Sequence, residues 1–316
     1  MSYAQFNLIE ASDFNNLAGG NPTTSSTVLN STWATGGGQI GYGQAAVGNV
    51  AAGQVVAATN WASLVNGIAN SNAHQGGATL NLTAPTSGQI ISYVANIPSG
   101  ITTIFTNRGN AAAQGTTASN TQTTASAWTD YANFAFTVSF ANGDAARYFF
   151  NAGGQIKLQC THPNTTAGIN AAMNTLATAT GTVNISGQNS GTRTIAGTSY
   201  SGVTKTGGSG TATVSTNSGY FGLNTANTTI FDQDSGTEPY TTTVQIQYLA
   251  RTSGPTVGGN SDNGNVVSIN MLMDKVSGNG VIGSGSTCTC TVVPPSTTYL
   301  ANSWGTITLA GGNTTA

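Results

Sequence analysis

Residues 131–162 read YANFAFTVSFANGDAARYFFNAGGQIKLQCTH, and no other stretch of the chain is as dense in large apolar residues. Two runs within this stretch alternate apolar side chains with small or polar ones. The first run carries Phe134, Phe136, Val138 and Phe140, and the second carries Ile156, Leu158 and Cys160. An alternation with period two is typical of a strand that buries one face. We therefore predict that these two strands hold the main core.

An Asn-Gly pair at Asn142 and Gly143 lies between the two runs, and such a pair is a strong short-range signal of a hairpin. A two-residue turn would bury the side chain of Arg147, and an unpaired buried guanidinium is costly. A three-residue turn over residues 142–144 faces this side chain outward instead. We predict the three-residue turn. It also places Phe149 on the outer face, so Arg147 and Phe149 are our candidates for an interface between copies.

Charged residues are unusually scarce in this chain. The 316 residues include seven Lys and Arg and nine Asp and Glu, so 16 residues, or 5%, carry charge, against roughly 25% in ordinary soluble proteins. Such a composition can indicate low-complexity disorder, but disorder usually needs high net charge and few aromatics, and this chain has 24 aromatics, so we predict a folded protein. A net charge of −2 gives no basic field to attract nucleic acid. The composition fits a β-rich surface that packs against copies of itself.

The first part of the chain, residues 1–128, shows helical signals separated by loops. Residues 11–17 and 58–64 each contain a polar residue, an aromatic directly after it, and Leu three residues later, which is typical of a helix start. We expect the second of these helices to end near Gly76. A short third helix is predicted at residues 101–107. We interpret this part as a small helical module for attachment or oligomerisation.

The remaining residues, 129–316, are predicted to form a β-rich domain. A helix is expected at residues 169–176, and the Gly-, Thr- and Ser-rich region 181–219 is expected to form short strands and turns. Further strands are predicted at residues 240–251, 266–273, 287–293 and 304–309. Many short strands between Gly-rich turns indicate a sandwich. The expected fold is therefore mainly β, with a β-sandwich-like C-terminal part and a small helical N-terminal module.

The cysteines and the apolar segments bear on the compartment. No Lys or Arg precedes Arg108, so we expect no secretory signal, and no apolar run approaches the length of a membrane span. Cys288 and Cys290 are two apart on a predicted strand and share a face, so a disulfide between them is not expected. We predict that they and Cys160 are free, buried thiols.

Residues 146–156, ARYFFNAGGQI, resemble a run in virion structural proteins of tailed bacteriophages, notably those infecting cyanobacteria and other marine bacteria. Residues 11–17 and 30–44 look similar to the start of the same proteins. The resemblance covers about half of the chain and fades after Gly181. It implies a particle component, usually of the tail or its fibres, and it brings no catalytic or cofactor-binding residue to this chain.

The resemblance and the composition together lead us to expect a structural component of a tailed-phage virion, in the tail, baseplate or fibre, made in the host cytoplasm. It would act as a homo-oligomer, a trimer by analogy with fibres, beside neighbouring virion proteins. One alternative is a head decoration protein. Another is a receptor-binding adhesin that recognises host surface glycans. Its candidate stacking platforms are Trp128, Tyr200, Tyr220, Phe221 and Trp304, for which core packing is the competing interpretation.

Two sequence patterns are candidate sites. Residues 36–41 fit the G-x-G-x-x-G pattern of dinucleotide-binding proteins, but no apolar strand precedes them, so we interpret them as a loop. The acidic residues Asp232, Asp234 and Glu238 could bind calcium or hydrolyse a glycan, but they do not follow the EF-hand spacing. We interpret them as an exposed acidic turn and expect neither a metal nor enzymatic activity.

The only histidines are His74 and His162. His74 is expected at a helix end, where capping or solvent exposure is ordinary. His162 follows Cys160, but a zinc site needs more ligands. A Cys-His nucleophile is disfavoured, because Cys160 alternates with apolar residues that face the core. We therefore predict no catalytic residue and no cofactor.

Overall fold

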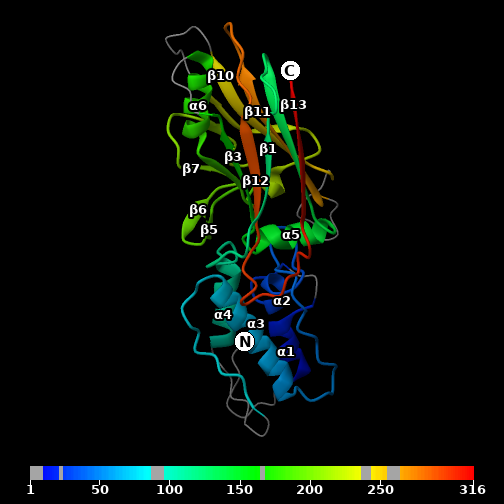
Figure 1. Ribbon diagram of the computed structural model, residues 1–316. Helices are drawn as coiled ribbons and strands as arrows, with labels where there is room; N and C mark the ends of the chain where they lie inside the picture. The colour runs from blue at the N-terminus through cyan, green and yellow to red at the C-terminus, as the bar shows by residue number, and fades with distance from the viewer. Residues whose placement is uncertain (1–9, 21–23, 87–95, 164–167, 236–242, 255–263) are drawn as a thin grey trace.

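The computed structural model describes residues 10–20, 24–86, 96–163, 168–235, 243–254 and 264–316. The molecule is elongated, with a helical part at one end and a β part at the other (Figure 1). The described residues include thirteen strands, all paired antiparallel. The predicted fold class, mainly β with a small helical N-terminal part and sandwich-like sheets, is therefore confirmed.

The helical part contains α1 (Ala11–Ala18), α2 (Leu29–Thr32), α3 (Ala58–His74) and α4 (Asn96–Thr106). The three predicted helices correspond to α1, α3 and α4. The aromatic residues that marked the helix starts, Phe14 and Trp61, pack edge to face with ring centroids 5.4 Å apart. They belong to a separate apolar core that also holds Leu17, Leu64, Ile68 and Ile101.

A five-stranded sheet forms one layer of the β part, in the order β1-β12-β3-β4-β7. Its strands are β1 (Ala118–Thr123), β12 (Thr287–Val293), β3 (Gln155–Thr161), β4 (Thr182–Ile185) and β7 (Val203–Thr206). Strand β1 precedes residue 128, the boundary suggested by the sequence. The change from helix to strand along the chain therefore comes earlier than that boundary.

A six-stranded sheet forms the other layer, in the order β13-β2-β11-β10-β9-β8. Its strands are β13 (Thr308–Thr315), β2 (Tyr131–Ser139), β11 (Val266–Lys275), β10 (Val244–Thr252), β9 (Thr228–Asp234) and β8 (Thr213–Val214). The side chains of β2 that were predicted to face inward are buried, namely Phe134, Phe136 and Val138. On the neighbouring strand β11, Met271 lies opposite Phe134 and Ile269 lies opposite Phe136. The main core lies between the two sheets.

Four smaller elements also belong to the β part. A two-stranded pair joins β5 (Arg193–Ile195) to β6 (Thr198–Tyr200), and a short 3-10 helix covers Tyr220–Gly222. Helix α6 (Gly168–Thr180), predicted at residues 169–176, buries Met173 and Leu176 against the core.

The predicted hairpin between residues 131 and 162 is wrong. Strands β2 and β3 lie in different sheets, and a helix, α5 (Gly143–Asn151), connects them. Asn142, expected to begin a turn, caps this helix, because its side-chain Oδ1 accepts a hydrogen bond from the backbone N–H of Ala145 at 2.8 Å. An Asn cap and an acid in the first turn, here Asp144, both stabilise a helix N-terminus.

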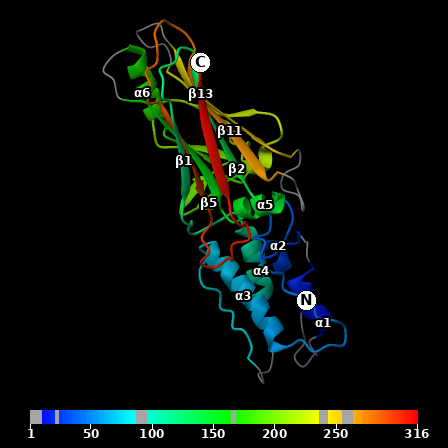
Figure 2. The ribbon, with the colours of Figure 1, turned by 45° about the vertical axis from the view of Figure 1, so that its right-hand side comes forward.

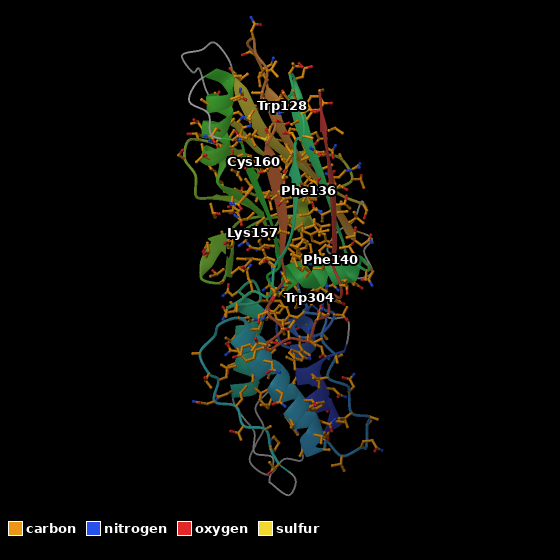
Figure 3. The ribbon with its side chains drawn as sticks, viewed as in Figure 1. Trp128, Phe136, Phe140, Lys157, Cys160 and Trp304 are labelled. Atoms are coloured by element: carbon orange, nitrogen blue, oxygen red, sulfur yellow. The ribbon has the colours of Figure 1, made fainter. Side chains whose placement is uncertain are left out.

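The last strand also differs from its prediction. It was expected at residues 304–309 but begins at Thr308, and Trp304 lies before it as a buried side chain of the core. Figure 3 shows Trp304 and Phe140 near α5, where the β part meets the helical part.

The edges of the two sheets pack against each other. Strands β1 and β13, each at the end of its sheet, lie side by side (Figures 1 and 2), and the Asn313 side-chain amide donates to the backbone carbonyl of Thr123 at 3.0 Å. At the opposite end, the Lys205 ammonium on β7 donates to Gln233 Oε1 on β9 at 3.0 Å. Covered edges protect a sheet from pairing with other chains.

Candidate functional site

Helix α5 lies at the boundary between the helical and the β parts (Figures 1 and 2). One side of this helix completes the β core, where the rings of Phe149 and Phe150 contact each other at a centroid distance of 4.9 Å. The Phe150 ring also stacks on Tyr220 at 4.4 Å. The remaining surface of α5 meets a loop of the helical part, and polar side chains form that contact. We call this contact region, built around α5, the junction.

Arg147 is the centre of the junction, and its side chain is completely buried. Its Nε and Nη2 donate to Asp144 Oδ1 at 3.1 and 3.0 Å. Its Nη1 donates to the backbone carbonyls of Thr35 and Ile40 at 2.8 and 3.0 Å. A buried guanidinium is tolerable only when its donors have partners of this kind. Arg147 therefore ties α5 to a loop more than a hundred residues away in sequence.

The loop that Arg147 holds is the glycine-rich segment of residues 35–43, which we call the glycine loop. Asn151, one turn after Arg147 on the same face of α5, donates to the carbonyls of Gly38 and Gly41 at 3.2 and 3.1 Å. Gly43 has φ +70°, and a Cβ there would lie 2.3 Å from the Tyr148 ring. The loop follows α2 rather than a strand, so the G-x-G-x-x-G match serves packing against α5.

A second set of polar contacts joins α3 to the end of α5. The Tyr42 hydroxyl donates to the carbonyl of Arg108 at 3.2 Å and accepts from Gln75 Nε2 at 2.8 Å. Burial raises the pKa of Tyr42 to about 12. His74 Nε2 donates to the carbonyl of Ala152 at 3.0 Å, and burial lowers the pKa of His74 to about 4. Both side chains are therefore neutral at pH 7.

Arg193, from β5, caps the same C-terminal end of α5. Its Nη1 donates to the carbonyls of Phe150 and Asn151, each at 3.1 Å. Unpaired carbonyls at a helix C-terminus carry partial negative charge and favour a cation. Burial lowers the pKa of Arg193 to about 10, so this guanidinium keeps its charge at neutral pH. Of only seven basic residues in the chain, two are thus buried against α5.

The chain returns to the junction a final time between β12 and β13. Gln44 Nε2 donates to the carbonyl of Ala301 at 3.0 Å, while the backbone N–H of Ala301 donates to Gln44 Oε1 at 2.8 Å. The Ser303 hydroxyl donates to the carbonyl of Tyr42 at 2.6 Å. Segments from both parts therefore interlock in this region through part-buried hydrogen bonds.

The two residues proposed for an interface between copies lie inside the molecule. Phe149, expected to face outward, is fully buried and packs against Phe140 with ring centroids 5.2 Å apart. Arg147, expected to face outward, is equally buried. Side chains with no exposed surface offer nothing to a second copy. The structure instead places them at an internal contact between the two parts of one chain.

The buried histidine His162 is also structural. Its Nδ1 is 2.9 Å from the Ser286 hydroxyl and its Nε2 is 3.1 Å from Asn170 Oδ1. Burial lowers the pKa of His162. The hydrogen-bonded series of Ser286, His162 and Asn170 is similar to the triad of a hydrolase, but the Ser286 side chain has no exposed surface with which to contact a substrate. These contacts connect β12 to α6.

The acidic residues weighed as a calcium site do not converge in the described residues. Asp232 accepts from Gln245 Nε2 at 2.8 Å and from Gln247 Nε2 at 3.2 Å, both on the neighbouring strand. Asp234 is exposed, and Glu238 lies outside the described residues. Across the part of the chain that the structure describes, no three His, Cys, Asp or Glu side chains are placed to hold a metal ion.

The aromatic residues proposed as glycan-stacking platforms are core residues. None has more than 8% of its surface exposed, and the set comprises Trp128, Tyr200, Tyr220, Phe221 and Trp304. Tyr220, for example, stacks on Phe150 and donates its hydroxyl to the carbonyl of Gly264 at 3.0 Å. Core packing, the competing interpretation, is therefore the correct one for these side chains.

The prediction of free, buried thiols is confirmed for Cys160, Cys288 and Cys290. Several junction residues were missed, among them Tyr42, Gln75 and Arg193. One sequence signal was available: Arg147 and Asn151 are four residues apart, which places two polar groups on one helical face. That signal needs the helix to be recognised first, and the Asn-Gly pair pointed to a turn.

Within the described segments, no helix is both long enough and apolar enough to cross a membrane. Comparisons with known proteins found no match, whether to a family model, to a curated protein or to a solved structure.

Proposed function

We propose that this chain is a structural component of a tailed-phage virion, in the tail, baseplate or fibre. The observation that carries the proposal is the position of residues 146–156. This run resembles virion structural proteins, and in the fold it forms most of α5 and the start of β3. The most specific part of the resemblance is thus the segment that joins the two parts of the molecule.

The surface of the five-stranded sheet supports an assembly role. Its outer face carries cross-strand hydroxyl pairs, with Ser119 and Thr291 at 2.7 Å and Thr121 and Thr289 at 2.8 Å. Lys157 is the one charged residue in the paired stretches of β1, β12 and β3. A regular sheet face with so little charge has little repulsion to keep copies or neighbouring proteins apart.

The partners that follow from this proposal are other copies of the chain and adjacent virion proteins. Threefold symmetry is our expectation, and it rests on analogy with phage fibres. Sedimentation of the purified chain at micromolar concentration tests it. A trimer supports this expectation, whereas a monomer over the whole concentration range contradicts self-assembly.

Location in the particle tests the proposal directly. Purified particles are labelled with an antibody against this chain and imaged by electron microscopy. Label on the tail, baseplate or fibres supports the proposal, and label on the capsid surface identifies a head decoration protein instead. Absence of the chain from purified particles, judged by mass spectrometry of the same preparation, overturns both assignments.

A further inference from the structure

Two of the three cysteines lie directly opposite each other in the core. Cys160 on β3 pairs with Cys288 on β12 in the antiparallel register, and both side chains face the space between the sheets. Figure 3 marks Cys160 in the middle of the β part. The third thiol, Cys290, is opposite Leu158 instead. Only one pair of cysteines is therefore positioned for a bond within the described residues.

The phase of the hydrogen-bond ladder brings this pair close. The backbone N–H of Thr124 donates to the carbonyl of Ser286 at 2.9 Å, which continues the β1–β12 register. Residues two apart on a strand direct their backbone N–H and C=O groups to the same side. The N–H and C=O groups of Cys288 therefore point toward β1, as the carbonyl of Ser286 does. Cys288 and Cys160 are then a non-hydrogen-bonded pair, whose Cα atoms are about 4.5 Å apart. Disulfides span Cα separations of roughly 4.4–6.8 Å.

The surroundings make the two thiols unequal. A hydrogen bond from the Cys288 thiol lowers the pKa of Cys160, and burial opposes it. Burial raises the pKa of Cys288. Cys160 also keeps 5% of its surface exposed, whereas Cys288 has none. Because the thiolate is the reactive form, Cys160 is the thiol that reacts first with an oxidant.

We propose that Cys160 and Cys288 form a redox-modification site, in which hydrogen peroxide converts the two thiols into a disulfide that links β3 to β12. In the first step, the Cys160 sulfur attacks one peroxide oxygen, the O–O bond breaks, and the other oxygen leaves as water with the proton that Cys160 gave up. In the second step, the Cys288 sulfur attacks the resulting sulfenic sulfur and the S–O bond breaks. The oxygen leaves as a second water with the Cys288 proton. Two thiols lose two electrons, and one peroxide gains them.

This bond would fasten two adjacent strands in the middle of the five-stranded sheet. The chemistry is independent of the proposed virion role. It suits such a role, however, because a particle protein is made in a reducing cytoplasm and is later released into an oxidising medium. The free thiols and the disulfide then correspond to the protein before and after release.

The test uses the full chain, reduced, freed of reductant and treated with hydrogen peroxide while folded. Free thiols are then alkylated in urea, and the protein is digested and analysed by mass spectrometry. We expect a cross-linked peptide pair containing Cys160 and Cys288, a loss of two hydrogens from the intact mass, and a higher Tm for the oxidised protein. The variant Cys290→Ser should behave like the wild type in all three measurements.

The variants Cys160→Ser and Cys288→Ser should lose both the cross-link and the rise in Tm. Circular dichroism before oxidation shows whether each variant is folded, and Cys160→Ala and Cys288→Ala replace any serine variant that is not. Three results overturn the proposal: a cross-link to Cys290, a cross-link that forms only in urea, or three alkylated thiols in peroxide-treated, folded wild type.

Discussion

Buried cations are the unusual residues of this molecule. A guanidinium that leaves water loses its hydration, and only good partners offset that loss. Arg147 obtains a carboxylate and two carbonyls, and Arg193 obtains the last carbonyls of α5. In a chain with seven basic residues, placing two of them here indicates that the junction needs fixed geometry.

The first prediction concerns Arg147. The change Arg147→Ala removes the buried guanidinium together with its hydrogen bonds to the carbonyls of Thr35 and Ile40 and to the carboxylate of Asp144. We expect the free energy of unfolding to fall by about 3–5 kcal/mol, as when one partner of a buried pair is removed. Urea unfolding measures this loss. The control Arg251→Ala, at an exposed position on β10, should change stability by less than about 0.5 kcal/mol. Equal effects of the two changes would show that Arg147 does not hold the junction.

The second prediction concerns pH. Burial lowers the pKa of His74 to about 4, while in the unfolded chain it is near 6.5. Between these values the unfolded state binds more protons than the folded state, so stability decreases as pH falls below about 6.5. From pH 7 to pH 5 we expect His74 to contribute a loss of about 2 kcal/mol.

The variant His74→Gln isolates this contribution. It removes the titrating group, so the difference in unfolding free energy between pH 7 and pH 5 should become smaller by that amount. His162, whose pKa burial also lowers, remains in the variant and leaves a residual dependence of the same sign. An unchanged pH dependence in His74→Gln would mean that His74 is accessible to water.

At the residue scale, the sequence could not predict that Arg147 is buried. The prediction of an outward side chain rests on the cost of burying an unpaired guanidinium. One partner, Asp144, lies three residues earlier on the same helix, but the other two are the carbonyls of Thr35 and Ile40, which come from a loop of the other part of the molecule. Backbone carbonyls are present at every residue, so composition gives no sign of which of them will accept. The free thiols could be predicted, because their alternation with apolar residues depends on local sequence alone.

At the scale of elements, the strands formed where the alternating pattern predicted them, but the connection between β2 and β3 is a helix rather than the predicted turn. The alternation in β2, β3, β11 and β12 was strong enough to place each of them within a few residues. The apolar residues of segment 143–151 do not strictly follow either the period of two that is typical of a strand or the period of 3.6 that is typical of a helix. Asn142 favours both a turn and a helix cap. The helix forms because β2 and β3 belong to different sheets, and that information is not local.

The third prediction tests the close packing of the glycine loop on α5. Gly43 has φ +70° and an added Cβ would lie 2.3 Å from the Tyr148 ring, whereas Gly53 has φ +79° and open space around it. Gly53→Ala should therefore cost only the strain of a left-handed backbone, about 1–2 kcal/mol. Gly43→Ala adds a steric clash and should cost about 1–3 kcal/mol more. Urea unfolding of both variants gives the difference, and equal losses would contradict the contact with Tyr148.

At the scale of the whole molecule, the two parts are joined by several passes of the chain. The glycine loop, α5 and the segment around Ala301 and Ser303 all meet at the junction. The sequence predicted two parts, because the helical and the alternating patterns differ. The interlocking between them could not be predicted, since it depends on hydrogen bonds between residues as far apart as Gln44 and Ala301.

The fourth prediction concerns β13 and the closing of the sandwich. β13 pairs with β2 along Ala132–Ser139, a stretch with no charged residue and no proline. Removing residues 306–316 would leave this stretch as an uncovered edge, next to the equally uncharged β1. Edges without charges, prolines or bulges pair readily with other chains. We therefore expect the truncated protein to be less stable to urea and to sediment as larger species than the full chain at the same concentration.

The control for this truncation is Asn313→Ala. It removes the side-chain hydrogen bond to the carbonyl of Thr123 but keeps the β13–β2 ladder, so it should cost about 1 kcal/mol and leave sedimentation unchanged. If the truncated protein sediments like the full chain and unfolds at the same urea concentration, β13 is not what protects the β2 edge.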